Sequence, residues 1–202
     1  MLQPYLDKKI YPLSPMYKSI ILPARRKESS ILNRNLLEET ASDRSRVIFS
    51  SSFRRLQQKA QVFSLETNAA VRSRLTHSLE VADYGRLIAQ NVTNRLISNG
   101  MLDSALQIPF INIVETSCLL HDIGNLPFGH FGETAIQEWF SENWKEKYQT
   151  ATSRENPDDQ ITDWMNDFLE FDGNPQGFRI ITLLQQPPVE ISGTGLNLTM
   201  SQ

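Results

Sequence analysis

The longest uninterrupted helical pattern in the chain spans residues 71–98, and it limits the possible fold more than any other feature. Apolar residues recur there at steps of three and four, which is the spacing of one face of an α-helix. The stripe consists of Leu75, Leu79, Ala82, Ala89, Val92 and Leu96. Asn99 and Gly100 follow as a typical helix C-terminus. The pattern therefore predicts one long amphipathic helix.

Helical periodicity also dominates the rest of the chain. Residues 111–123 are nearly all apolar and are followed by Gly124 and Pro127, which predicts a second, buried helix. Further helical patterns cover residues 43–58, 133–148, 161–171 and 176–186. No strand-like alternation of any length appears, so we predict an all-α fold. Residues 1–40 contain four prolines and no sustained periodicity, which predicts an irregular N-terminal arm before a helical domain at 41–202.

Composition is that of an ordinary globular protein. The chain has 202 residues, of which 40% are hydrophobic and 21% are charged, so it can bury a sizeable core. One cysteine excludes an internal disulfide bond. We find no signal-peptide pattern and no apolar stretch long enough to span a bilayer, and we expect no membrane partner and a cytoplasmic location.

Charge is distributed unevenly along the chain. Residues 44–95 contain nine Arg or Lys and three acidic residues, whereas residues 96–202 contain four and fifteen. Such zones arise when helices present solvated faces, but a cluster of cations also raises the local electrostatic potential. The basic zone therefore admits an anionic ligand, and a nucleotide polyphosphate fits it as well as a nucleic acid does.

The three histidines of the chain indicate a metal site. They are His77, His121 and His130, and the last two belong to a glycine-rich run that ends at Glu133. Neutral imidazole is the commonest metal ligand, and Asp122, directly after His121, supplies an anionic oxygen. The pair alone also fits a hydrogen-bonded core histidine followed by a helix-end aspartate, and it favours that alternative.

Neighbouring residues strengthen the metal hypothesis. Arg74 lies three residues before His77 on the predicted long helix, so the two side chains share a face. An arginine in that position can bind a phosphate whose oxygens touch the metal. This arrangement is typical of phosphoryl transfer.

The glycine-rich turn is expected to bring His130 back toward His121. Its glycines permit a sharp reversal of the chain, and they are Gly124, Gly129 and Gly132. Glu133 lies one helical step from His130, so the two side chains can meet. The alternative for Glu133 is an acidic residue in the first turn of a helix, where the helix dipole stabilises it.

Several ordered blocks of sequence extend over roughly residues 35–200. They are Asp43-Arg-Ser-Arg-Val-Ile-Phe-Ser-Ser-Ser-Phe-Arg-Arg-Leu-Gln, Gln61-Val-Phe, Val71-Arg-Ser-Arg-Leu-Thr-His-Ser-Leu-Glu-Val, Leu120-His-Asp-Ile-Gly-Asn-Leu-Pro-Phe-Gly-His-Phe-Gly-Glu, Asn174-Pro-Gln-Gly-Phe-Arg-Ile and Gly195-Leu-Asn-Leu-Thr. Together these blocks resemble a known family, the deoxyguanosine triphosphate triphosphohydrolases of the HD-domain superfamily. Six blocks in order are far less probable by accident than one motif.

The resemblance implies a metal-dependent hydrolase with the all-α HD-domain fold. Such enzymes convert dGTP and water to deoxyguanosine and triphosphate with a divalent ion, Mg²⁺ or Mn²⁺. The family's first three metal ligands match His77, His121 and Asp122. The fourth, a distal aspartate, has no match, so residues 41–202 resemble a partial HD-type domain from the N-terminal part of the family. Nearer substitutes for that ligand are Asp158, Asp159, Asp163, Asp167 and Asp172.

The resemblance also implies roles for the remaining candidates. Arg74 would hold phosphate oxygens, His130 would move a proton to the departing 5′ oxygen, and Glu133 would orient His130. Gln57 and Gln61 lie in the segment that approaches the sugar and base of dGTP or another dNTP. Complete members assemble as homo-oligomers, and some relatives bind single-stranded DNA.

Two other functions are kept as alternatives. The first is a catalytically silent remnant that binds a nucleotide or a single-stranded nucleic acid through residues 44–95. The second is a different HD-type nucleotidase or phosphodiesterase. The blocks Arg54-Arg-Leu-Gln and Pro127-Phe-Gly-His-Phe-Gly-Glu argue against this second alternative.

Overall fold

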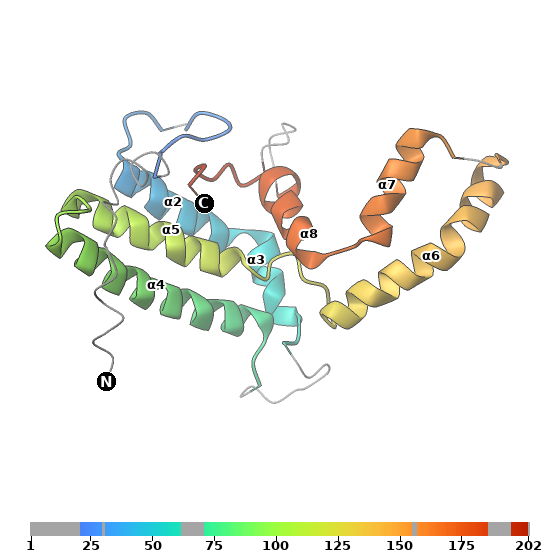
Figure 1. The fold of residues 1–202 in the computed structure, drawn as a ribbon, viewed down its shortest axis with the longest axis horizontal. Coiled ribbons are helices and arrows are strands. Elements are labelled where there is room, and N and C mark those ends of the chain that lie inside the picture. Colours follow the sequence, from blue (N-terminus) through green and yellow to red (C-terminus); the bar gives the residue numbers. More distant parts are fainter. Residues whose placement is uncertain (1–20, 30, 62–70, 155–156, 186–194, 202) are drawn as a thin grey trace.

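Every regular element of the structure, a computed structural model, is helical within the part of the chain that it describes. That part comprises residues 21–29, 31–61, 71–154, 157–185 and 195–201. The elements are α2 (Leu36–Phe49), α3 (Ser51–Arg55), the 3₁₀ turn η2 (Leu56–Gln58), α4 (Arg74–Ser98), the 3₁₀ turn η3 (Ser104–Leu106), α5 (Gln107–Leu120), α6 (His130–Thr152), α7 (Asp159–Leu169), α8 (Gly173–Arg179) and the π-helical turn η4 (Ile180–Leu184) (Figure 1). The predicted all-α fold is confirmed.

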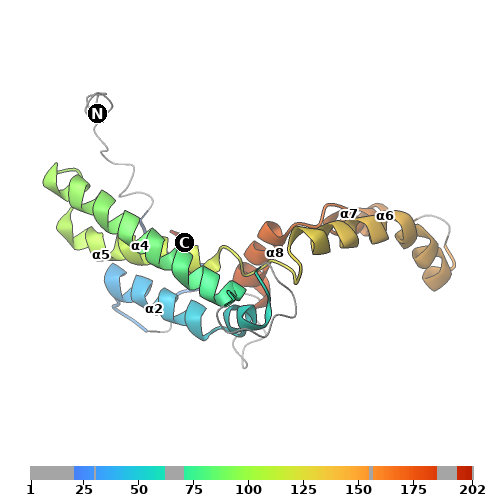
Figure 2. The ribbon, with the colours of Figure 1, turned by 90° about the horizontal axis from the view of Figure 1, so that it is seen from below.

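Helices α2, α4 and α5 form the body of the molecule, with α5 packed against both of the others (Figures 1 and 2). The core beneath them is mostly aliphatic, and its buried residues are Val47, Phe53, Leu56, Ala82, Leu119, Leu120 and Ile123. Among the described residues, no helix combines the length and the apolar character that a membrane crossing requires.

The buried face of α4 differs from the stripe that its periodicity predicts. Its buried residues are Arg74, Ser78, Ala82, Gly85, Ala89 and Thr93, most of which are small. Leu79 and Val92 belong to the predicted stripe but are 46% and 42% exposed. Small side chains let two helix axes approach closely, and the contact with α5 has selected that face of α4.

Helix α2 begins earlier than the proposed domain boundary at residue 41. Asn35 caps the helix by accepting a hydrogen bond from the backbone N–H of Glu38, and the Glu38 carboxylate accepts one from the backbone N–H of Asn35. This reciprocal capping box satisfies two backbone donors that a helix start otherwise leaves without partners. The first part of α2 therefore lies within the segment expected to be irregular.

A buried ionic cluster joins residues 21–27 to residues 195–201. Arg25 pairs with both Glu39 and Asp43 of α2, and it also donates to the Asn197 carbonyl. Asp43 is fully buried and accepts a second hydrogen bond from the Thr199 backbone N–H at 2.9 Å. Burial alone would raise the pKa of Glu39, but the hydrogen bond and charge of Arg25 outweigh it and lower that pKa. The cluster thus ties two distant segments to one helix.

Helices α6 and α7 project from the body as an arm (Figures 1 and 2). They pack against each other through stacked rings of Phe140 and Phe168, whose centroids are 4.4 Å apart. After α7 the chain returns, and α8 lies beside the base of the arm (Figure 1). The first residue of α6, His130, and the first residue of α8, Gly173, therefore both lie where the arm meets the body.

Candidate active site

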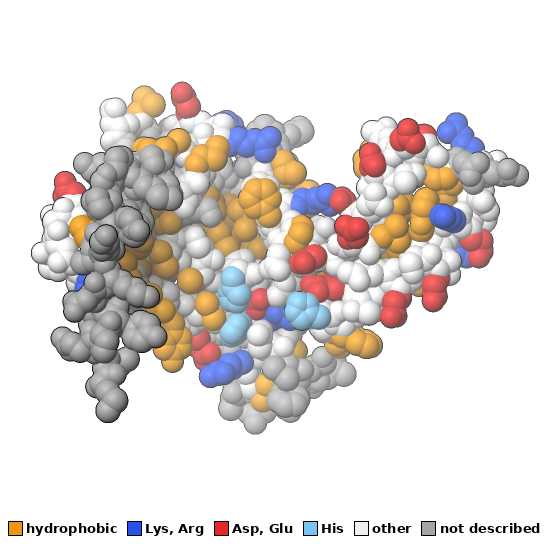
Figure 3. Space-filling view, in the orientation of Figure 1, with side chains coloured by type: hydrophobic (Ala, Val, Ile, Leu, Met, Phe, Trp, Pro, Cys, Tyr) orange, Lys and Arg blue, Asp and Glu red, His pale blue; other side chains and the backbone are white. Residues whose placement is uncertain are grey.

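The fold brings His77, His121 and Asp122 together. His77 comes from α4, whereas His121 and Asp122 come from the turn that follows α5. One possible ligand atom from each residue lies within 4.8 Å of the others, and the two imidazole rings meet edge to face with centroids 5.2 Å apart. Figure 3 shows histidine side chains beside acidic groups at the surface of the molecule. The three residues form a possible metal site.

Hydrogen bonding prepares His121 to act as a ligand. Its Nδ1 lies 2.7 Å from the Cys118 carbonyl oxygen, and because a carbonyl only accepts, Nδ1 is the donor. The lone pair of the neutral ring is therefore on Nε2, which lies 3.6 Å from Asp122 Oδ1. Metal-binding histidines usually hold their second nitrogen in this way, which fixes the tautomer and the ring orientation. The donor set thus fits a divalent ion.

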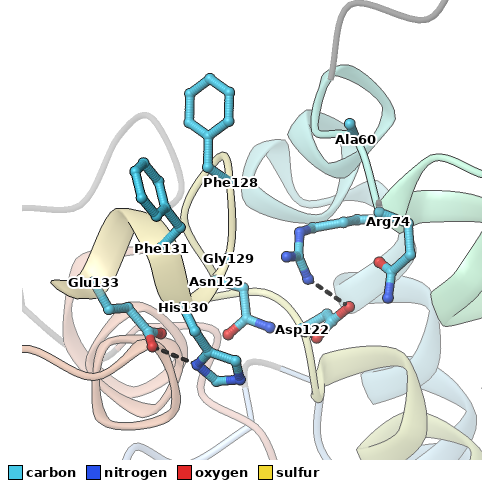
Figure 4. A pocket seen from close by; sticks show the side chains of 10 residues that line it. Ala60, Arg74, Asp122, Asn125, Phe128, Gly129, His130, Phe131 and Glu133 are labelled. Carbon is cyan, nitrogen blue, oxygen red and sulfur yellow. Dashed lines mark hydrogen bonds and ion pairs between the residues drawn. The ribbon is translucent and has the colours of Figure 1, made fainter. Parts of the chain in front are cut away.

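Asp122 is buried and held by two neighbours. Arg74 Nη1 donates to one carboxylate oxygen at 3.0 Å, and Asn125 Nδ2 donates to the other at 2.5 Å (Figure 4). The Arg74 side chain is only 7% exposed, and its Nε has no hydrogen-bond partner in the described part of the chain. A buried guanidinium donor without an acceptor is costly, and an anionic ligand would supply one.

His130 and Glu133 form a second pair at the start of α6. His130 Nδ1 lies 2.6 Å from Glu133 Oε2, and the carboxylate can only accept, so Nδ1 carries the proton (Figure 4). The His130 side chain is 95% exposed, whereas that of Glu133 is 10% exposed. The hydrogen bond expected from the helical spacing is therefore present, and it leaves Nε2 of His130 open to solvent.

A cavity of about 520 Å³ lies between the Arg74–Asp122 pair and the His130–Glu133 pair. Its lining residues are Ala60, Gln61, Arg74, Asp122, Asn125, Phe128, Gly129, His130, Phe131 and Glu133. The two glutamines proposed to approach the substrate differ in position. Gln61 lines the cavity with a buried Oε1 that has no partner among the described residues, whereas Gln57 is exposed and accepts a hydrogen bond from the Ser73 hydroxyl. The structure thus brings only Gln61 to the cavity.

Lys59 is a neighbour of the site that the sequence analysis missed. Its Nζ donates to the Asn125 carbonyl at 2.7 Å, and its own carbonyl accepts the N–H of Arg74 at 2.9 Å. Burial, followed by the charges of Arg74 and Arg55, lowers the pKa of Lys59. Lys59 therefore joins the first residue of α4 to the turn that contains Asp122. In the sequence, only its position two residues before Gln61, a predicted site residue, indicated that Lys59 lies near the site.

The aspartates considered as a fourth ligand have other positions. Asp158 caps α7, Asp172 caps α8, and Asp167 pairs with Arg179 at 2.5 Å. In the described part of the chain, no further His, Cys, Asp or Glu joins the cluster of His77, His121 and Asp122. The possible metal site has three ligands there.

Comparison with known proteins agrees with the resemblance. The HD domain family matches residues 74–168, which include His77, His121 and Asp122 as well as the His130–Glu133 pair. Proteins named deoxyguanosinetriphosphate triphosphohydrolase from Cronobacter sakazakii, Serratia proteamaculans and Yersinia pestis are 45%, 41% and 42% identical to the chain.

These matches cover 80%, 83% and 80% of the chain but only 34%, 35% and 34% of the three relatives. The chain therefore spans about a third of the length of the relatives that it matches. The family inferred from ordered blocks is found again by both comparisons: residues 74–168 match the HD domain family, and the chain is similar to proteins named deoxyguanosinetriphosphate triphosphohydrolase over about a third of their length.

Proposed function

We propose that the chain contributes to the metal-dependent hydrolysis of dGTP to deoxyguanosine and triphosphate. The observation that carries this proposal is the convergence of His77, His121 and Asp122, because Asp122 also lines a cavity together with Arg74 and His130. The names of the relatives supply the substrate, and dGTP is therefore proposed by similarity. Mg²⁺ and Mn²⁺ are the proposed ions, as the family resemblance implies, and the Asp122 carboxylate is an oxygen ligand of the kind that suits both.

The cavity is suited to a nucleoside triphosphate. Its volume of about 520 Å³ falls within the range of about 300–1,000 Å³ that small-molecule sites occupy. Arg74 would bind phosphate oxygens through the guanidinium atoms that Asp122 leaves free. Gln61 would accept a hydrogen bond from the sugar or base, which would satisfy its buried Oε1.

The proposed reaction breaks the bond between the α-phosphorus and the 5′ oxygen. A bound divalent ion would supply charge neutralisation and a more acidic water. Water attacks the α-phosphorus, and His130, protonated on both ring nitrogens, donates its Nε2 proton to the departing 5′ oxygen. The attacking water releases one proton to solvent, and His130 takes up one proton from solvent to restore its charged form. Glu133 holds Nδ1 of His130 and stabilises the ring while it is charged.

We expect the purified chain to release triphosphate from dGTP more slowly than a complete relative. Three ligands hold an ion less firmly and less well oriented than four, and the loss of even an indirect ligand contact costs about 10–100-fold. The assay compares triphosphate release by the chain and by the Cronobacter relative at equal Mn²⁺ concentration. Equal turnover by the two proteins would contradict the inference that the metal site of this chain is incomplete. Metal binding without any turnover would favour the catalytically silent alternative.

Replacing His121 by alanine is expected to abolish metal binding. The variant removes one of three ligands together with its fixed Nε2 lone pair, so the remaining His77 and Asp122 hold the ion weakly. Isothermal titration calorimetry with Mn²⁺ measures the effect. His130→Ala is the matched control, because it removes an imidazole that lies outside the ligand cluster. Equal losses in both variants would argue against His121 as a ligand.

A further inference from the structure

The start of α8 holds the carboxylate of Glu133 from the side opposite His130. The backbone N–H of Gly173 donates to Glu133 Oε1 at 2.9 Å, while Glu133 Oε2 accepts from His130 Nδ1 at 2.6 Å. The Gly173 hydrogen bond is buried, and both bonds to the carboxylate are charge-assisted. The two oxygens thus have separate partners, which fix the direction in which the carboxylate faces His130.

Gly173 also packs against the metal side of the site. A Cβ atom on residue 173 would overlap the side-chain oxygen of Asn125 and would lie 2.8 Å from Glu133 Oε1. Asn125 is the residue whose amide donates to Asp122, and its side chain lies between the His130–Glu133 pair and Asp122 (Figure 4). Only a residue without a side chain can occupy this place, since both neighbours are polar groups already fixed by hydrogen bonds.

From these contacts we infer that Gly173 is a positioning residue, which sets the place of His130 relative to Asp122 through Glu133 and Asn125. His130 is 95% exposed, so packing does not hold its ring, and its hydrogen bond to Glu133 has to do so. The part of the inference that concerns turnover rests on the proposed function. Gly173 lies outside the residues that the HD domain family matches, 74–168. The hydrogen bond that holds Glu133 therefore comes from the segment after that match.

The test is the Gly173→Ala variant, with Gly177→Ala as the matched control. Both are glycine-to-alanine changes in α8, and at Gly177 the nearest atom to an added Cβ is the backbone nitrogen of Gly124 at 3.3 Å. The control therefore requires an adjustment of only a few tenths of an ångström. Circular dichroism establishes that each variant remains helical.

The first readout is the protonation pattern of the imidazole rings, recorded by long-range ¹H–¹⁵N NMR in the metal-free protein. The spectra are recorded at about pH 8.5, two units above the ordinary histidine pKa of about 6.5. The chain has three histidines, so His77 and His121 serve as internal references. We expect the parent and Gly177→Ala to show His130 protonated at Nδ1. In Gly173→Ala, the His130 signals should move toward a mixture of tautomers, while those of His121 stay in place.

The second readout is steady-state hydrolysis of dGTP. Gly173→Ala should lower kcat by about 10–100-fold, as expected for the loss of an indirect positioning contact, and should change KM by less than about twofold. Unchanged His130 signals in a folded Gly173→Ala protein would overturn the inference, as would the same change in Gly177→Ala. Absence of turnover in the parent would count against the proposed function alone, because the NMR readout does not depend on it.

If Gly173→Ala fails to fold, Asp172→Ala replaces it. Asp172 caps α8 by accepting from the backbone N–H of Asn174 at 2.7 Å, so its removal loosens the first turn without adding an atom beside Glu133. The same shift of the His130 signals, at smaller size, would support the inference. Unchanged signals in this folded variant would overturn it.

Discussion

Replacing His130 by alanine is expected to lower the rate of triphosphate release from dGTP by about 10²–10⁴-fold, since positioned acid–base groups supply about that much in rate. The variant removes the only histidine that pairs with Glu133, and with it the proposed proton donor to the 5′ oxygen. A single-turnover assay with excess protein measures the chemical step even if the parent chain is slow.

The control for His130→Ala is Phe131→Ala, the neighbouring residue on α6, whose side chain also lines the cavity but has no acidic proton. Calorimetry with Mn²⁺ should give the same affinity for both variants and the parent, because neither residue belongs to the cluster of possible ligands. A loss of less than about tenfold in His130→Ala would be too small for a general acid and would contradict the assigned role.

Replacing Asp43 by alanine is expected to lower the free energy of unfolding by about 3–5 kcal/mol, the usual cost of removing one partner from a buried ion pair. Asp43 is fully buried, pairs with Arg25 and accepts the backbone N–H of Thr199. The change leaves a buried guanidinium with one carboxylate fewer and a buried amide without an acceptor. Unfolding by urea, followed by circular dichroism, measures the loss.

Glu80→Ala is the control for Asp43→Ala, because Glu80 also pairs with an arginine but does so at the surface. The Arg72–Glu80 pair is 66% and 45% exposed, and such pairs contribute about 0–1 kcal/mol. Equal losses of stability in the two variants would mean that the cluster around Arg25 does not hold residues 21–27 and 195–201 to α2.

Local sequence patterns predicted the helices well and their buried faces less well. The long helix expected at residues 71–98 is α4, and the apolar helix expected at 111–123 is α5. Within α4, Ala82 and Ala89 are buried as predicted, but Leu79 is exposed. Periodicity shows that a helix has an apolar side, whereas the side that packs depends on how closely a neighbour approaches. The distance between two helix axes depends on the side chains of both helices, so it cannot be predicted from the periodicity of one helix.

The same distinction between local sequence and tertiary packing applies to the candidate site. Its proposed chemical groups, the imidazoles of His77, His121 and His130 and the carboxylates of Asp122 and Glu133, belong to residue types that could be recognised from the sequence by type and spacing. Their metal-binding and catalytic roles stay predictions, but the contact between His130 and Glu133 was expected from helical geometry and is present.

The sequence by itself determined the helical class, the family resemblance and the residue types available for chemistry, because these depend on side-chain identity and on short-range periodicity. Only the tertiary structure decided that Lys59 holds the Asn125 carbonyl and that the Gly173 N–H holds Glu133. The groups that accept or donate in these two contacts are a backbone carbonyl and a backbone amide. Nearly every residue has both, so their identity contains no signal, and their partners lie 66 and 40 residues away along the chain. Their selection came from the packing of α8 against the turn after α5 and the start of α6, and from the position of that turn beside Lys59.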